Sequence, residues 1–298
     1  MGRDLRDKVI VITGASSGIG AATAVACAAA GMDVAIAARR EVRLRDVAGR
    51  IEQLGRRVVT VRCDVAEDGD VAHLFERAWA ELGRVDVAFA NAGYGLASSV
   101  LDTTDEQHRA IFEVNYFGTL RVVREAVPYL RRTGNGLGHL LICSSAASEI
   151  GLPWFGAYSA TKAAQDCIAG ALRSELQDEV EVTSVHPVGT KTDFFDTAEQ
   201  MAGGDGPGMV NTPGLFTQTP EKVARKIVAA LRRPRAEVWP LGIARLGLGL
   251  ATILPGLTNR VLKWESRGKD PKQNRISVPS ASPSQPEPEP QETTHESP

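Results

Sequence analysis

The fold is decided near the N-terminus by the stretch Val9-Ile10-Val11-Ile12-Thr13-Gly14-Ala15-Ser16-Ser17-Gly18-Ile19-Gly20. The β-branched run at its start is typical of a strand that is buried on both faces. A glycine-rich turn follows, and the alanine-rich segment Ala21 to Ala30 predicts a helix that stops at Gly31. Such a turn lets the backbone approach a pyrophosphate, whose charge is favoured by the helix N-terminus. The stretch therefore predicts a nucleotide-binding strand-turn-helix unit.

The same alternation of strand and helix continues along the chain. We expect further strands at 34–37, 58–61, 85–90, 140–143, 180–185 and 237–239, and helices at 41–54, 70–82, 104–117, 120–130 and 220–231. A further helix carries Tyr158 and runs to about Leu176. Strict alternation predicts parallel strands joined by right-handed crossovers. The fold class we expect is α/β: a doubly wound Rossmann fold with a parallel seven-stranded sheet and helices on both faces.

We expect three parts in the chain. Residues 1–240 form the nucleotide-binding and catalytic domain, with a mobile lid between Phe194 and Gln218, where glycine is frequent and periodicity is lost. Residues 241–267 form an apolar helical extension. Residues 268–298 are rich in Pro, Ser and Glu, a composition that cannot offset ordering entropy, so we expect a disordered tail.

The extension carries apolar residues at helical spacing from Leu241 to Leu262. Arg245, Pro255 and Arg260 interrupt it, and a bilayer-spanning helix needs about 20 apolar residues, so we reject a spanning helix. The segment has three alternatives: to close a pocket, to pack on another subunit, or to make peripheral contact with a membrane through 241–262. We favour the first two over the membrane.

Composition excludes some partners and compartments. The 298 residues include 34 Lys and Arg and 36 Asp and Glu, and a net charge of -2 does not indicate nucleic acid as a partner. The four cysteines (Cys27, Cys63, Cys143 and Cys167) lack the spacing of a metal or redox motif, so we expect core residues in a reducing compartment. No apolar leader precedes Val9, so we expect a cytoplasmic chain.

A tyrosine and a lysine are the candidate reactive groups. Tyr158 and Lys162 are four residues apart, which places them on one helix face, one turn from each other. A free tyrosine has a pKa of about 10, and a neighbouring cation lowers it, which would make the pair a general acid/base. Such pairs are also common on solvated helices. Here the glycine turn, Asn91-Ala92-Gly93, Asn115 and Ser145 all precede the pair in order.

The whole set resembles the single-domain branch of the short-chain dehydrogenase/reductase family, over residues 7 to 240. The resemblance implies hydride transfer between a nicotinamide and a carbonyl or secondary alcohol. Tyr158 would exchange the proton with the substrate oxygen, Ser145 would orient that oxygen, and Asn115 would keep a water in a proton relay. Lys162 would lower the tyrosine pKa and, with Tyr158, hold the nicotinamide ribose. Ser144 is the rival of Ser145, and spacing back from the tyrosine favours Ser145.

We expect no metal, because a carbonyl is the electrophile and the cofactor supplies the hydride. The nucleotide would be held at the glycine turn by Gly14, Ser16, Ser17, Gly18, Ile19 and Gly20. At the end of the second strand, an NAD site has an acid and an NADP site has a cation. This chain has Ala38-Arg39-Arg40, so we expect NADP, with Arg39 as the preferred ligand and NAD as the alternative.

Further cofactor contacts are implied by the resemblance alone. Asp64 and Val65 would contact the adenine, and Asn91, Ala92 and Gly93 would line the adenine ribose. Asn91 has a plain alternative as a turn-former. Pro187 and Thr192 keep family positions near the carboxamide, but Val188 stands where the family usually has glycine and Thr190 where it has valine.

The substrate pocket is less defined by the sequence. Tyr94, Leu96, Leu152, Trp154 and Phe155 are candidate lining residues, and their apolar character favours an apolar carbonyl or alcohol. By resemblance we expect a homodimer or homotetramer. The alternative to an enzyme is a non-catalytic NADP-binding or scaffold protein of the same fold.

Overall fold

Seven parallel strands form one sheet in the computed structural model, which describes residues 2–133, 138–190, 194, 198 and 217–266. The strands are β1 (Val9–Thr13), β2 (Asp33–Ala38), β3 (Val58–Arg62), β4 (Val87–Ala90), β5 (Gly138–Cys143), β6 (Val180–Val185) and β7 (Glu237–Val238). Their order in the sheet is β3-β2-β1-β4-β5-β6-β7. The doubly wound parallel sheet predicted from the sequence is confirmed.

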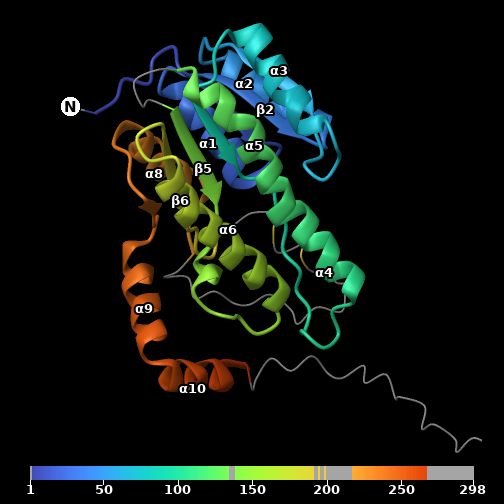
Figure 1. Cartoon of the computed structure of the whole chain (residues 1–298), viewed down its shortest axis with the longest axis vertical. Coiled ribbons are helices and arrows are strands. Elements are labelled where there is room, and N and C mark those ends of the chain that lie inside the picture. The colour runs from blue at the N-terminus through green and yellow to red at the C-terminus, as the bar shows by residue number, and fades with distance from the viewer. Residues whose placement is uncertain (1, 134–137, 191–193, 195–197, 199–216, 267–298) are drawn as a thin grey trace, which may run out of the picture.

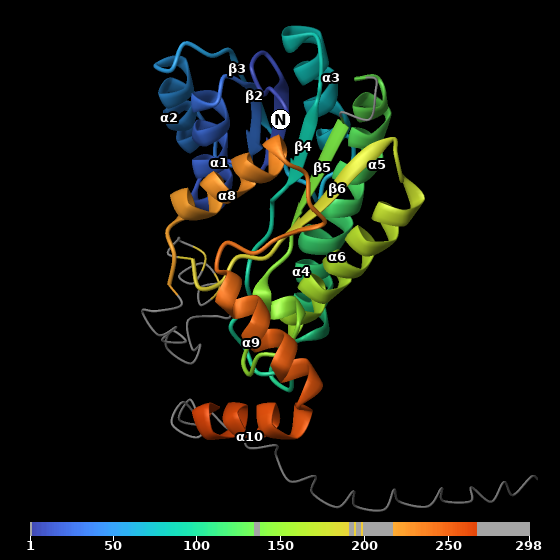
Figure 2. The ribbon, with the colours of Figure 1, turned by 90° about the vertical axis from the view of Figure 1, so that its left-hand side faces the viewer.

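Helices cover both faces of this sheet (Figures 1 and 2). One layer holds α1 (Gly18–Ala29), α2 (Glu41–Glu52) and α8 (Pro220–Arg232); the other holds α3 (Asp70–Leu82), α5 (Gly118–Arg131) and α6 (Gly156–Glu175). Ile10 and Ile12 of β1 pack into the first layer, whereas Val9 and Val11 pack into the second. All four are at most 1 % exposed, which explains why the strand reads as a continuous apolar run.

The helices before β5 differ from the expectation. Thr104 caps α4 (Asp105–Phe112) through a capping box with Gln107. No break follows, because the backbone continues through a π-helical turn, Glu113–Phe117, directly into α5. The turn places Asn115 in the protein interior, and single π-helical turns of this kind occur often at functional sites. One cysteine also differs: Cys167 is exposed, while the other three are buried.

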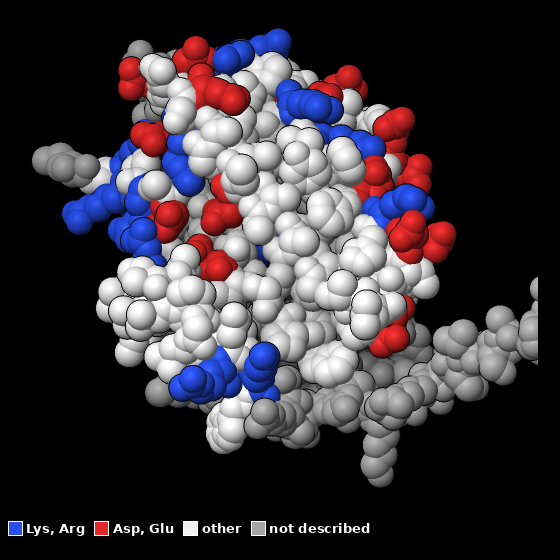
Figure 3. All heavy atoms as spheres, turned by 60° about the horizontal axis from the view of Figure 1, so that its bottom comes forward, with Lys and Arg blue, Asp and Glu red and all other residues white. Residues whose placement is uncertain are grey.

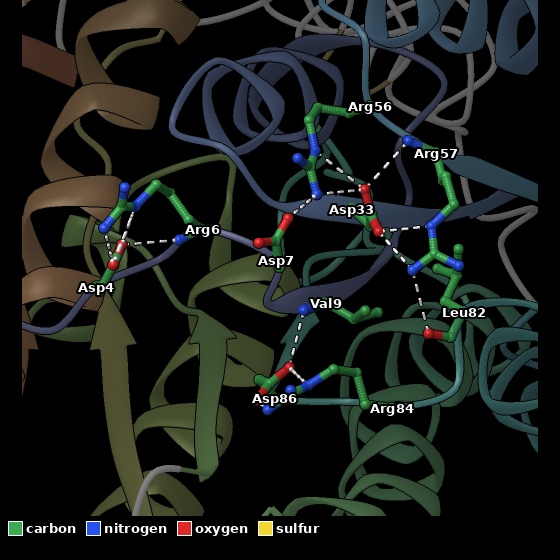
Figure 4. Close-up of polar contacts among 10 residues, drawn as sticks. All are labelled: Asp4, Arg6, Asp7, Val9, Asp33, Arg56, Arg57, Leu82, Arg84 and Asp86. Atoms are coloured by element: carbon green, nitrogen blue, oxygen red, sulfur yellow. Dashed lines mark hydrogen bonds and ion pairs between the residues drawn. The ribbon is translucent and has the colours of Figure 1, made fainter.

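Buried carboxylates hold the amino ends of the strands, opposite the site described below (Figure 4). Asp33 of β2 accepts hydrogen bonds from Arg56 Nε at 3.0 Å and Arg57 Nε at 2.8 Å. Burial raises the pKa of Asp33, but the hydrogen bonds and charges of the two arginines outweigh it and hold that pKa below its ordinary value. Asp86 accepts similarly from Val9 N at 2.8 Å and from Arg84.

The apolar extension forms two helices rather than one. These are α9 (Gly242–Ile253) and α10 (Pro255–Ser266), and they lie at one end of the molecule (Figures 1 and 2). Proline fits the first turn of a helix but not its interior, so Pro255 starts the second helix. Among the described helices, none has the length and apolar character needed to cross a membrane. Most of the expected lid, and the expected tail, lie outside the described residues.

Candidate active site

The site lies where the strand order changes direction, between β1 and β4. In open parallel sheets, ligands bind outside the carboxyl ends of the strands at this point. A cavity of about 1030 Å³ opens there. Of the residues predicted for the site, it is lined by Gly14, Ser16, Ser17, Gly18, Ile19, Arg39, Arg40, Asp64, Val65, Asn91, Ala92, Gly93, Ser145, Tyr158, Lys162 and Pro187.

The glycine turn is shaped by close backbone contacts. Gly14 has a φ of +68° and Gly18 a φ of +56°, and residues other than glycine rarely adopt such angles. A Cβ atom on Gly20 would lie 2.5 Å from the carbonyl oxygen of Gly14. Gly20 does not line the cavity itself, so within the described residues it serves to bring α1 against the turn.

Asn91 braces this turn from the neighbouring strand. Its Nδ2 donates to the carbonyl oxygens of Thr13 at 3.0 Å and Gly14 at 3.3 Å. The hydroxyl oxygen of Thr13 in turn accepts from the amides of Asn91 and Ala92, both at 3.2 Å. The side chain of Asn91 therefore joins the ends of β1 and β4, while the residue also faces the cavity.

Two arginines follow β2 and differ in their contacts. Arg40 Nη2 donates to Ser17 Oγ at 2.9 Å and to Ser16 Oγ at 3.2 Å, so its guanidinium lies against the glycine turn. The side chain of Arg39 is 63 % exposed and reaches Asp64 Oδ2 at 3.5 Å. This end of the cavity thus holds two cations and two hydroxyl groups, which suit a phosphate.

Ser145, Tyr158 and Lys162 meet at the other end of the cavity. Tyr158 and Lys162 come from the first turns of α6, and Ser145 follows β5. A side-chain hydrogen bond joins Ser145 to Tyr158. Lys162 Nζ donates to the carbonyl oxygen of Cys143 at 2.7 Å and lies 5.6 Å from the centre of the Tyr158 ring. Ser144 points elsewhere, because its hydroxyl donates to the carbonyl oxygen of Lys162 at 3.2 Å.

The pKa of Tyr158 differs from the expectation. Burial raises it well above its ordinary value, and the hydrogen bond with Ser145 lowers it only in part. The rings of Phe155 and Phe194 pack edge-on against Tyr158, with centroids 6.4 and 5.1 Å away, and such surroundings disfavour a phenolate. Burial also lowers the pKa of Lys162. The expectation that the lysine depresses the tyrosine pKa is therefore corrected: the phenol is held in its protonated form.

Asn115 holds neighbouring segments and does not line the cavity. Its Nδ2 donates to Tyr94 O and to Thr161 Oγ1, each at 3.0 Å, and its Oδ1 accepts from Tyr94 N at 3.0 Å. Its carbonyl oxygen accepts from Gln165 Nε2 and from Thr119 Oγ1, both at 2.7 Å. These contacts connect the loop after β4 to α6. The water that Asn115 would hold in a proton relay remains a prediction.

The segment after β6 shows how the chain accommodates Val188. Gly189 has a φ of +43°, so the residue with left-handed backbone is at position 189, one residue after position 188, where the family usually has glycine. Gln218 secures the turn, since its Nε2 donates to Val188 O at 2.8 Å and its backbone N to Gly189 O at 3.2 Å. Pro187, Val188, Gly189 and Thr190 line the cavity. Thr192 lies outside the described residues.

Sequence reasoning identified the substrate side only in part. Tyr94, Leu152 and Phe155 line the cavity, whereas Leu96 and Trp154 do not. Of the three alternatives for the C-terminal extension, pocket closure agrees with the lining, which includes Ile243, Ala244, Leu246, Gly247, Leu248, Leu250 and Leu262. Their helical spacing was visible, but the spacing alone does not say which part of the domain the helices meet.

A buried imidazole behind Ser145 was missed. His186 stacks on Trp239 at 4.3 Å between ring centroids, and its ring nitrogens face Ser184 Oγ at 3.0 Å and the carbonyl oxygen of Ser145 at 3.4 Å. Asp166 of α6 approaches the same ring at 3.4 Å. The contacts connect β6, β7 and α6 to the segment that carries Ser145.

Comparison with known proteins identifies the family of the chain. A family model described as short chain dehydrogenase matches residues 8–203. An uncharacterised oxidoreductase of Bacillus subtilis, YxnA, is 31 % identical, with 88 % of this chain and 73 % of the relative covered.

Two solved structures share the fold. A short chain dehydrogenase from Mycobacterium paratuberculosis bound to NAD has a TM-score of 0.70 at 28 % identity, covering 79 % of this chain and 97 % of its own. An alcohol dehydrogenase from Thermococcus sibiricus complexed with 5-hydroxy-NADP has a TM-score of 0.68 at 31 % identity, covering 78 % and 94 %. The two neighbours therefore hold different forms of the nicotinamide nucleotide.

Proposed function

The chain belongs to the short-chain dehydrogenase family of oxidoreductases, and on this premise we propose that it transfers a hydride between NADP(H) and the carbonyl or secondary alcohol of an apolar small molecule. The observation that carries the proposal is one cavity that is lined both by the glycine turn and by Ser145, Tyr158 and Lys162. The glycine turn and Lys162 would hold the nucleotide along the cavity. The nucleotide supplies the hydride when bound.

The residues of the chain supply proton transfer and orientation. A carbonyl oxygen placed between Ser145 and Tyr158 would accept a hydrogen bond from each hydroxyl. The phenol of Tyr158 carries a proton at neutral pH and is placed to donate it as the oxygen gains charge, although the pKa that burial raises in the cofactor-free chain makes it a weaker acid. Donors fixed before the reaction stabilise such developing charge without reorganisation. The arrangement is therefore suited to carbonyl reduction.

The preference for NADP rests on the two arginines. The end of β2 offers Arg39 and Arg40 and no acid, and Ser16 and Ser17 add hydroxyl donors beside them. A ribose 2′-phosphate would gain charge-assisted hydrogen bonds there, whereas a 2′-hydroxyl would leave the guanidinium groups unused.

The apolar character of the substrate rests on the remaining lining of the cavity. This lining includes apolar side chains of the loop after β5 and of α9, among them Ile150, Leu152, Leu246 and Leu250. Apolar walls with a few placed polar groups are usual for small-molecule sites.

Loss of NADPH absorbance in the presence of a panel of aldehydes and ketones of increasing apolar length tests the proposal. We expect turnover that increases with apolar length. Tight NADPH binding without turnover on any carbonyl, or on the corresponding alcohols with NADP, would indicate the non-catalytic alternative instead. Assembly as a homodimer or homotetramer remains a prediction, for which sedimentation velocity is the measurement.

A further inference from the structure

The helices α9 and α10 stand at the mouth of the cavity. Ala244 of α9 is buried, and α9 packs on the short 3-10 helix Ala146–Ser148 that follows Ser145. Leu246 and Leu250 of α9 and Leu262 of α10 line the cavity. The two helices are thus attached to the catalytic domain at the rim of the site, and they extend beyond it (Figure 2).

The outer side of this pair is apolar and exposed. Seven large side chains are between 52 % and 77 % exposed: Ile243, Leu246, Leu250, Ile253, Leu257, Val261 and Trp264. The first three also line the cavity; we call the other four the outer face. In the rest of the described chain, large exposed apolar side chains are scattered over separate elements, as with Val42 on α2 and Leu101 after β4. A contiguous apolar patch of this kind marks an interaction surface.

Charge decides which partner suits the outer face. From Gly242 to Ser266 the chain carries Arg245, Arg260 and Lys263 and one acidic residue, Glu265, and Arg245 Nη2 pairs with Glu237 Oε2 at 3.0 Å. Figure 3 shows this end of the molecule as mostly uncharged surface with a few basic groups. A second copy of the face would bring the same excess of basic over acidic residues. Anionic lipid head groups would complement the cations, and the acyl region would complement the apolar side chains.

We propose that the outer face of α9 and α10 binds the surface of a phospholipid bilayer that contains anionic lipids. The helices lie on the membrane and do not cross it, consistent with their length and their basic residues. Trp264, 77 % exposed, is a residue type that favours the boundary between head groups and acyl chains. If the proposed oxidoreductase function holds, the cavity mouth faces the lipid and apolar substrates reach Tyr158 without crossing water.

Sedimentation of the full chain with vesicles tests the proposal. With vesicles of phosphatidylcholine containing a third phosphatidylglycerol, we expect the chain to sediment and its tryptophan emission to shift to the blue. Replacing Trp264 by Phe should remove most of that shift and leave sedimentation in place. The double variant Ile253→Glu/Leu257→Glu should weaken vesicle binding at least about tenfold, because two apolar contacts are lost.

Matched variants separate this contact from other effects. Leu101→Glu introduces the same charge at a side chain that is 97 % exposed outside the face, and it should leave vesicle binding unchanged. Arg260→Glu/Lys263→Glu should weaken binding to the anionic vesicles far more than to pure phosphatidylcholine. Ile253 and Leu257 do not line the cavity, so their double variant should keep turnover of a water-soluble carbonyl.

Two results would overturn the membrane contact. One is a parent chain that stays in the supernatant with anionic vesicles. The other is a dimer, seen by sedimentation velocity, that the Ile253→Glu/Leu257→Glu variant dissociates while neither protein binds vesicles; the outer face would then belong to a second copy. Vesicle binding without carbonyl turnover would leave the contact standing and refute the proposed function alone.

Discussion

Replacing Arg39 by Ala removes the exposed guanidinium at the end of β2 and leaves Asp64 without the cation 3.5 Å away. A hydrogen bond to a charged group contributes about 1.5–3 kcal/mol. Because the Arg39 side chain is 63 % exposed, solvent screening reduces this to about 1–2 kcal/mol. We therefore expect NADPH to bind about 5- to 30-fold more weakly, since about 1.4 kcal/mol corresponds to tenfold. NADH lacks the 2′-phosphate, and its affinity should change less than about twofold.

Calorimetric titration of both nucleotides into the parent chain and the variant gives the required ratio of affinities. Arg45→Ala is the matched control, because Arg45 is an exposed arginine of the helix that follows, α2, and does not line the cavity. The difference between parent and variant should shrink at about 1 M salt, where charges are screened within about 3 Å. An equal loss of NADH and NADPH affinity, or a parent chain that binds NADH as tightly as NADPH, would refute the assignment of Arg39 to the 2′-phosphate.

Three further predictions follow from the site and its supports. In the cofactor-free chain, the difference in tyrosinate absorbance between the parent and Tyr158→Phe should develop only above pH about 10, because burial raises the pKa of Tyr158 above its ordinary value. A phenolate that forms near neutral pH would show that the charge of Lys162 outweighs burial in setting this pKa. Gly20→Ala should lower the free energy of unfolding by about 1–3 kcal/mol and weaken NADPH binding, because the new Cβ would lie 2.5 Å from the carbonyl oxygen of Gly14. The control Gly49→Ala in α2 should not destabilise the chain, because no atom lies within 4 Å of its Cβ. Asp33→Asn should destabilise the folded chain by about 1–3 kcal/mol near neutral pH. Because the pKa of Asp33 is depressed in the folded chain, the difference between parent and variant should be lost as the pH falls below about 4. A difference in melting temperature that does not depend on pH would contradict this prediction.

The sheet and the glycine turn could be predicted because their signals are local. The run from Val9 to Ile12 is apolar on both faces, and the glycines at 14 and 18 supply left-handed backbone within the same stretch. The helix that carries Tyr158 and Lys162 is long and places both side chains by its own periodicity.

The rest of the site depends on contacts between distant segments. Phe155 and Phe194 bury the Tyr158 ring, so the direction of its pKa could not be judged from the neighbouring lysine alone. Asn91 was expected at a ribose or as a turn-former; it lines the cavity, but its amide bonds to Thr13 and Gly14 across two strands could not be predicted. The apolar spacing of α9 was clear, but its place at the cavity mouth depends on packing against the segment after Ser145.

A single-turnover measurement of hydride transfer in Tyr158→Phe tests the proposed chemistry most directly. The change removes the phenol hydroxyl and keeps the ring that packs on Phe155 and Phe194. With a carbonyl that the parent chain reduces, we expect the rate of NADPH oxidation to fall about 10²–10⁴-fold, the usual contribution of a positioned proton donor. NADPH affinity should stay unchanged, because the glycine turn, the arginines and Lys162 remain. A variant that binds NADPH normally and reduces the same carbonyl at near the parent rate would contradict the assignment of Tyr158 as the proton donor.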